Sequence, residues 1–112
     1  MIVDDHAGFR SFARALLEAE GFHVIGEAGD GPSALADIAR LHPHIVILDI
    51  QLPGIDGFEV AERLAGGVDP PDVVLVSTRA ASSYRRRLAG SPVRGFIPKD
   101  ELSGSALSAL VS

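Results

Sequence analysis

Polar side chains follow four apolar runs of this chain, at the point where each run ends. They comprise three carboxylates, one hydroxyl and one ammonium group, on Asp4, Asp5, Asp49, Ser77 and Lys99. Continuous apolar runs bounded by turn residues are typical of strands that are buried on both faces in a parallel sheet. Parallel strands end at one edge of the sheet, where ligands bind in open α/β folds. The pattern therefore predicts a single site that contains all five side chains.

The chemistry of these side chains favours transfer of a phosphoryl group. Three clustered carboxylates repel one another, and a hard divalent cation such as Mg²⁺ or Mn²⁺ relieves that repulsion by taking oxygen ligands. The Asp49 carboxylate can attack phosphorus as a nucleophile and form an aspartyl phosphate. The metal and Lys99 would then stabilise charge on the equatorial oxygens, and Ser77 would donate a hydrogen bond to the new group. The added charge of about −2 is large enough to reorder a nearby loop.

Strands and helices alternate along the chain, which predicts an α/β fold with a parallel sheet. The predicted strands are residues 1–3, 22–28, 45–49, 73–77 and 93–98. The predicted helices are residues 7–20, 32–40, 58–65, 79–88 and 102–111. Right-handed crossovers place helices on both faces of the sheet, so we expect three layers.

Length and composition narrow the class of protein. A chain of 112 residues is expected to form one domain with its own apolar core. The absence of cysteine excludes disulfides and thiolate zinc sites. The net charge of −5 argues against direct binding of nucleic acid by this segment. No apolar run approaches the ~20 residues of a membrane span, and no secretion signal opens the chain, so we expect a cytoplasmic protein.

Four motifs in this order make the chain similar to the receiver domain of bacterial two-component response regulators. They are Val3–His6, Ile47–Gly57, Val74–Thr78 and Gly95–Lys99. The resemblance covers residues 1–112 as one domain, and the short first and last elements indicate a domain that is trimmed at both ends. It implies the flavodoxin-like fold, which is doubly wound with a five-stranded parallel sheet in the order 2-1-3-4-5.

The resemblance also implies a role for each site residue. Asp49 would be the phosphoacceptor. Asp4 and Asp5 would bind Mg²⁺ or Mn²⁺, with Asp5 the more direct ligand, and the backbone carbonyl of Gln51 would complete the protein ligands. Lys99 would bind the phosphoryl group.

A second set of implied roles concerns the response to phosphorylation. Ser77 would be the switch hydroxyl, and Phe96 the aromatic switch residue that moves with it. Thr78 and Arg79 would modify access to the phosphoryl group and its lifetime. Asp100 stands where the family usually has proline after the lysine, and Lys-Asp endings occur in the branch that carries helix-turn-helix output domains.

The implied partners follow from the family. A histidine kinase would supply the phosphoryl group. The surface of the fourth helix, fifth strand and fifth helix would mediate a homodimer, and a DNA-binding output domain would lie outside this segment. The charged run 85–87 is expected to be a solvated helix face.

Two other functions remain open at this point. A phosphohydrolase with an aspartyl nucleophile would need an acid/base residue two positions after Asp49, where this chain has Gln51, so we expect a signalling switch and not an enzyme. A degenerate receiver would act only as an interaction module, and the complete acidic set argues against it. His6 is expected to be an exposed loop residue, because imidazole is a poor ligand for Mg²⁺.

Overall fold

A single five-stranded parallel sheet forms the centre of the computed structural model, which describes residues 1–111. The strand order is β2-β1-β3-β4-β5, which confirms the predicted flavodoxin-like topology. The strands are β1 (Ile2–Val3), β2 (Glu27–Ala28), β3 (Ile45–Asp49), β4 (Asp72–Ser77) and β5 (Gly95–Pro98). The α-helices are α1 (Ala7–Ala19), α2 (Gly31–Leu41), α3 (Gly57–Ala65), α4 (Arg85–Ala89) and α5 (Gly104–Val111). Two 3₁₀ turns, η1 (Ala81–Tyr84) and η2 (Lys99–Glu101), precede α4 and α5.

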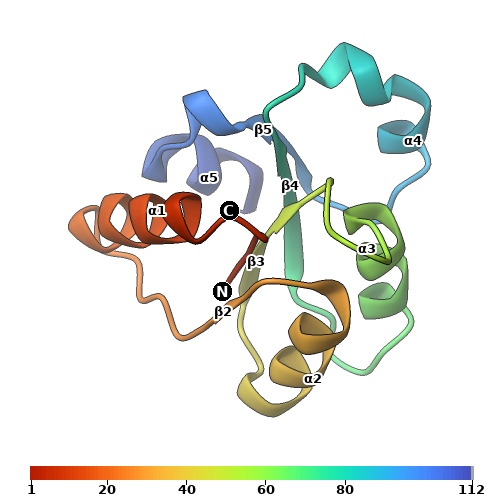
Figure 1. Cartoon of the computed structure of the whole chain (residues 1–112), viewed down its shortest axis with the longest axis horizontal. Coiled ribbons are helices and arrows are strands. Elements are labelled where there is room, and N and C mark those ends of the chain that lie inside the picture. Colours follow the sequence, from red (N-terminus) through yellow and green to blue (C-terminus); the bar gives the residue numbers. More distant parts are fainter. Residues whose placement is uncertain (112) are drawn as a thin grey trace.

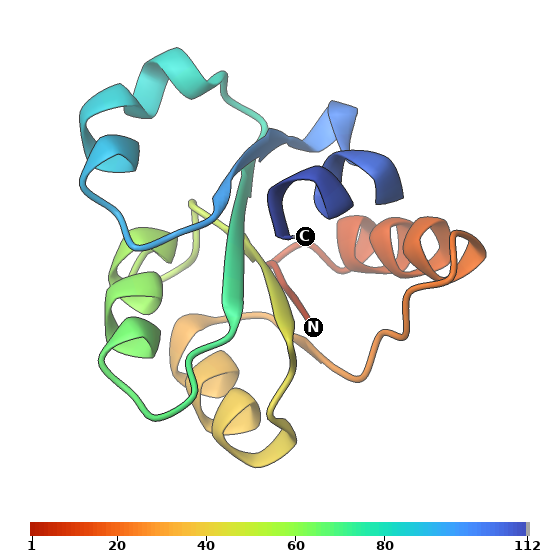
Figure 2. The same cartoon turned by 180° about the vertical axis from the view of Figure 1, so that it is seen from behind.

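Helices cover both faces of the sheet, as Figures 1 and 2 show from opposite sides. Helices α1 and α5 pack together on one face, where Leu17 and Leu107 are buried against Ile2 and Val74. Helices α2 and α3 cover the other face, where Phe58 belongs to the second core. The residues of η1 and α4 that contact this core, Tyr84 and Leu88, are only partly buried. The region of η1 and α4 is therefore the most weakly anchored part of this layer.

The two central strands are apolar at nearly every position because both of their faces are covered. Strand β3 pairs with β4 in a register that sets Asp49 opposite Val76. Strand β4 pairs with β5 so that Ser77 lies opposite Pro98, the residue before Lys99. The parallel register thus brings the polar ends of three strands to one edge of the sheet.

Side-chain caps define where two of the helices begin. Asp30 accepts a hydrogen bond from the Ser33 N–H at 2.8 Å and starts α2, with Pro32 in the first turn. Asp56 accepts from the Glu59 N–H at 3.0 Å and starts α3. These carboxylates satisfy backbone donors that have no partner inside the helix.

Two predicted element boundaries were wrong. The strand predicted at 22–28 contains only Glu27–Ala28, because β1 offers just two residues for pairing. The helix predicted from Arg79 begins as the turn η1 and becomes α-helical only at Arg85, because Ala80 is extended and no side chain caps η1. The remaining elements agree with the prediction to within about three residues. No helix in the described part of the chain is long and apolar enough to span a bilayer.

Candidate functional site

Three polar side chains are buried in the described part of the chain, and all three lie at the carboxyl edge of the sheet. The exposed fraction is 0% for Asp4, 2% for Asp49 and 0% for Ser77. Burial of a carboxylate is unfavourable unless a cation or hydrogen-bond donor compensates for the lost water. Their position at the ends of β1, β3 and β4 therefore marks this edge as the candidate site.

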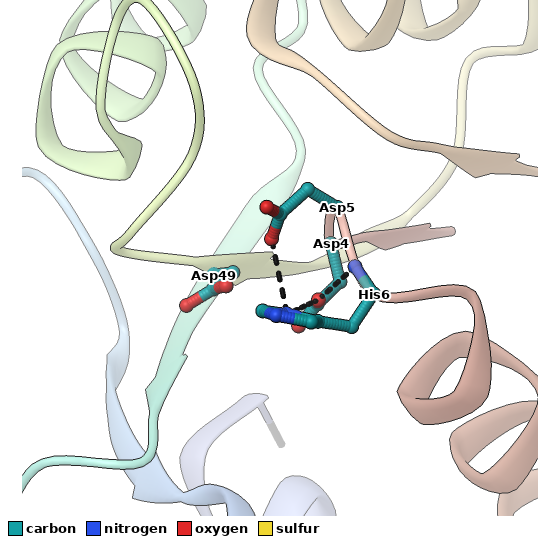
Figure 3. Close-up of side chains that lie close together, drawn as sticks. All are labelled: Asp4, Asp5, His6 and Asp49. Carbon is teal, nitrogen blue, oxygen red and sulfur yellow. Dashed lines mark hydrogen bonds and ion pairs between the residues drawn. The ribbon is translucent and has the colours of Figure 1, made fainter.

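The carboxylates of the site lie close together (Figure 3). Ligand atoms of Asp4, Asp5, His6 and Asp49 all lie within 4.8 Å of one another. Asp49 Oδ1 accepts a hydrogen bond from the Gln51 N–H at 3.1 Å, which orients the carboxylate at the start of the loop. The prediction that these three acidic side chains share one site agrees with this geometry.

Lys99 joins two of these carboxylates. Its Nζ lies 2.6 Å from Asp4 Oδ2 and 3.3 Å from Asp49 Oδ2. The side chain is 11% exposed, and Nζ also lies 4.6 Å from the centre of the Phe9 ring. The single lysine of the sequence is thus held by opposite charge and by an aromatic face at the end of β5.

The electrostatic environment disfavours a charged Asp49. Burial, and to a smaller extent the negative charge of Asp4, raise the pKa of the Asp49 carboxyl above its usual range. The Gln51 N–H and Lys99 act in the opposite direction without cancelling the shift. An additional cation would therefore stabilise the ionised form of this carboxylate.

The donor set fits a hard divalent cation. Asp4, Asp5 and Asp49 offer carboxylate oxygens, which are preferred ligands of Mg²⁺ and Mn²⁺. Asp4 Oδ2 is buried, and its polar contact is the ion pair with Lys99. Gln51 follows Asp49 by two residues, so its backbone lies beside the cluster and is anchored there by the hydrogen bond to Asp49.

His6 lies closer to the site than predicted. The imidazole is 71% exposed, as expected of a loop residue, but Nδ1 lies 3.2 Å from Asp4 Oδ1 and 3.1 Å from Asp5 Oδ1 (Figure 3). The His6 N–H also donates to Asp4 Oδ1 at 2.8 Å. This backbone bond turns the chain so that the ring faces the acidic pair. The only signal in the sequence is that His6 directly follows these residues.

The hydroxyl of Ser77 has a partner that sequence reasoning missed. Ser77 Oγ lies 3.0 Å from the hydroxyl of Tyr84, and it accepts a hydrogen bond from the Arg79 N–H at 3.1 Å. The Tyr84 ring lies between Phe58 and Phe96, with centroid distances of 5.9 and 6.1 Å. Phe96 therefore contacts Tyr84, the partner of Ser77, whereas Arg79 contacts the Ser77 hydroxyl through its backbone N–H. The only signal in the sequence for this partner is that Tyr84 is the single tyrosine of the chain.

Two predicted modifiers lie at the rim of the site. Thr78 and Arg79 directly follow Ser77 and are both exposed. Their position fits a role in access to the site, which stays a prediction.

Gly57 supports the Asp49 end of β3 by close packing. A Cβ at this position would overlap the Asp49 carbonyl oxygen and lie 2.9 Å from Ile50 Cα. We expect Gly57→Ala to push these backbones apart and to lower the free energy of unfolding by about 2 kcal/mol. Urea denaturation measures this change. Gly8→Ala is the matched control, because its Cβ would meet no atom within 4 Å, and an equal loss there would contradict the packing argument.

Several known proteins are similar to this chain. The family model "Response regulator receiver domain" matches residues 1–111. The transcription regulator BvgA of Bordetella pertussis is 39% identical over 101 residues, which is 90% of this chain and 48% of that protein. A protein-glutamate methylesterase/protein-glutamine glutaminase of Myxococcus xanthus is 42% identical over 84 residues, or 74% of this chain and 24% of that protein.

A solved structure is similar over almost the full length. The signal receiver domain of the response regulator NarL from Mycobacterium tuberculosis superposes with a TM-score of 0.84 and is 32% identical. The superposition covers 97% of this chain and 92% of that one. By contrast, the chain spans about half the length of BvgA.

Proposed function

The chain belongs to the response regulator receiver domains of two-component systems, and from this premise we propose that Asp49 is the phosphoacceptor of an Mg²⁺-dependent switch. The observation that carries the proposal is a buried Asp49 carboxylate at the end of β3 that shares the Lys99 ammonium with Asp4. The phosphodonor would be a partner histidine kinase, and the domain would act in the cytoplasm.

The proposed reaction transfers a phosphoryl group between two side chains. An Asp49 oxygen attacks phosphorus, the P–N bond of the donor's phosphohistidine breaks, and the neutral imidazole leaves after taking up a proton. Lys99 Nζ, which contacts both Asp4 and Asp49, is placed to pair with an oxygen of the transferred group. The hydrogen bond from Gln51 holds Asp49 in a fixed orientation for the attack.

Asp4, Asp5, Asp49 and the backbone carbonyl of Gln51 would hold Mg²⁺ or Mn²⁺ in this proposal. The ion, when bound, neutralises charge on the phosphoryl oxygens during transfer. Asp5 is the most exposed of the three acids, with a side chain that is 36% exposed. It is therefore the acid that can meet a hydrated ion with the smallest structural change.

We expect Asp5→Asn to weaken Mg²⁺ binding at least about tenfold, because a charge-assisted contact of about 1.5–3 kcal/mol is lost. Isothermal titration calorimetry with Mg²⁺ alone measures the affinity. EDTA should also abolish labelling of the wild-type chain by acetyl phosphate.

Asp69→Asn is the matched control for this titration. Asp69 is exposed in a turn with a φ of 50°, a conformation that asparagine also tolerates, so its replacement should leave the affinity unchanged. Equal affinities of the wild-type chain and Asp5→Asn would remove Asp5 from the ligand set. A wild-type chain that binds no Mg²⁺ would favour a degenerate receiver that acts as an interaction module.

The output of the switch would pass through β4, α4 and β5. BvgA is a transcription regulator of about twice this length, which supports a DNA-binding output domain outside the segment and control of transcription. For a homodimer, we propose the overlapping surface of α4, β5 and α5.

A turnover enzyme is the less favoured function. Gln51 occupies the position two residues after the nucleophile, and an amide cannot relay a proton in hydrolysis of a phosphomonoester. The methylesterase relative matches over only 24% of its length. We therefore propose that the domain catalyses only its own phosphorylation and dephosphorylation. Steady hydrolysis of p-nitrophenyl phosphate by the purified chain would contradict this view.

A further inference from the structure

The Ser77 hydroxyl is engaged on the side of the molecule that faces α4. Among residues 1–111, its hydrogen-bond partners are Tyr84 and the Arg79 N–H, whereas the Asp49 oxygens bond to Gln51 and Lys99. Ser77 lies one residue beyond Val76, the residue that pairs with Asp49. Either hydroxyl can be the donor in the pair with Tyr84. Where Ser77 donates, its one hydrogen must leave Tyr84 before it can bond to a phosphoryl oxygen.

Tyr84 is held in place by contacts that reach across the layer. Its ring packs between Phe58 of α3 and Phe96 of β5. One turn later, Arg87 Nη2 lies 2.8 Å from Asp56 Oδ2, and its guanidinium lies 4.2 Å above the centre of the Phe58 ring. Asp56 in turn caps α3. The arginine therefore fastens the segment that carries Tyr84 to the helix beside it.

The rest of this segment, residues 81–89, has few other anchors. None of its residues is buried, and no side chain caps η1 or α4. Its attachment depends on Tyr84, Arg87 and the partly buried Leu88. A segment with so few buried contacts can change position at low free-energy cost when one of these contacts is lost.

We propose that Tyr84 is a positioning residue that holds the Ser77 hydroxyl in the unphosphorylated state, and that a phosphoryl group on Asp49 competes with Tyr84 for this hydroxyl. The exchange frees Tyr84 and loosens residues 81–89 from α3. This inference rests on the proposed function, and it makes Tyr84, together with Phe96, part of the path from the site to α4.

Tyr84→Phe tests the competition because it removes the hydroxyl and keeps the ring between Phe58 and Phe96. The bond to Ser77 is present only in the unliganded state, so its loss should favour the liganded state. We expect the affinity for beryllofluoride with Mg²⁺, a mimic of the phosphoryl group, to rise about fivefold, which corresponds to a hydrogen bond of about 1 kcal/mol. Fluorine-19 NMR titration measures this affinity, and the affinity for Mg²⁺ alone should not change.

A double-mutant cycle separates this role from a merely structural one. In a Ser77→Ala background, Tyr84→Phe should have no further effect on beryllofluoride affinity, because the hydroxyl that it positions is gone. Arg87→Met should also raise the affinity, whereas Arg86→Met, which removes the same charge from an exposed neighbour, should not.

An unchanged affinity in Tyr84→Phe, or the same effect with and without Ser77, would overturn the inference and leave the proposed function intact. A wild-type chain that fails to bind beryllofluoride, or an Asp49→Asn chain that binds it as wild type does, would overturn the proposed function and this inference with it.

Discussion

Replacing Asp49 with Asn should abolish phosphorylation of the chain by acetyl phosphate in the presence of Mg²⁺. The amide is a poor nucleophile at phosphorus, and no second buried carboxylate at the end of β3 can replace it. Intact-mass spectrometry should show the gain of one phosphoryl group in the wild-type chain and none in the variant.

Asp72→Asn is the control for this experiment. Asp72 begins the neighbouring strand β4 at its opposite end, where it pairs with Arg94 on the surface, so its loss should leave labelling unchanged. Labelling that persists on another residue in Asp49→Asn would refute the assignment of the phosphoacceptor.

Asp49→Asn should also alter the pH dependence of stability. The pKa of Asp49 is raised in the folded state, so the fold binds this proton more tightly than the unfolded chain does. The wild-type chain therefore loses stability as the pH rises from the unfolded pKa near 3.8 through the raised folded value. We expect the variant to be more stable than the wild-type chain at neutral pH without Mg²⁺, and this advantage to vanish in acid. Urea denaturation across this pH range compares the two.

The second large effect is expected at Lys99. Its Nζ is the cation that contacts both buried carboxylates, Asp4 and Asp49. Lys99→Met keeps the apolar stem but removes the ammonium group, so the Asp4 and Asp49 carboxylates face each other without a cation. This change should lower the free energy of unfolding by about 3 kcal/mol at pH 7 without Mg²⁺. Mg²⁺ should restore more stability to the variant than to the wild-type chain, because the ion binds the folded state and supplies the missing charge.

Arg94→Met provides the matched control for Lys99→Met. The Arg94–Asp72 pair has a similar distance of 3.1 Å but is exposed on both sides, so its loss should cost about 1 kcal/mol or less. If Lys99→Met and Arg94→Met were equally stable, the buried position of Lys99 would have no energetic consequence.

The fold, and the gathering of Asp4, Asp5 and Asp49 at one edge of the sheet, could be predicted from the sequence. The apolar runs before Asp49 and Ser77 predicted buried parallel strands, and the alternation with helices predicted the layers. Parallel strands end at one edge, so Asp4, Asp5 and Asp49 lie together there, whereas the Ser77 hydroxyl bonds to Tyr84. The boundaries of β2 and η1 were predicted less well. For β2, the local pattern does not indicate how many residues the neighbouring strand β1 offers for pairing.

The pairing of these side chains could not be predicted from the sequence. The contact of Lys99 with Asp4 and Asp49 joins residues that are far apart in the chain, and their distance follows from strand order. The bond between Ser77 and Tyr84 depends on where η1 crosses the edge of the sheet, which Phe58 and Phe96 determine by packing. Sequence periodicity indicates which face of a helix or strand is buried. It carries no information on which partner a given hydroxyl or ammonium group contacts on a neighbouring element.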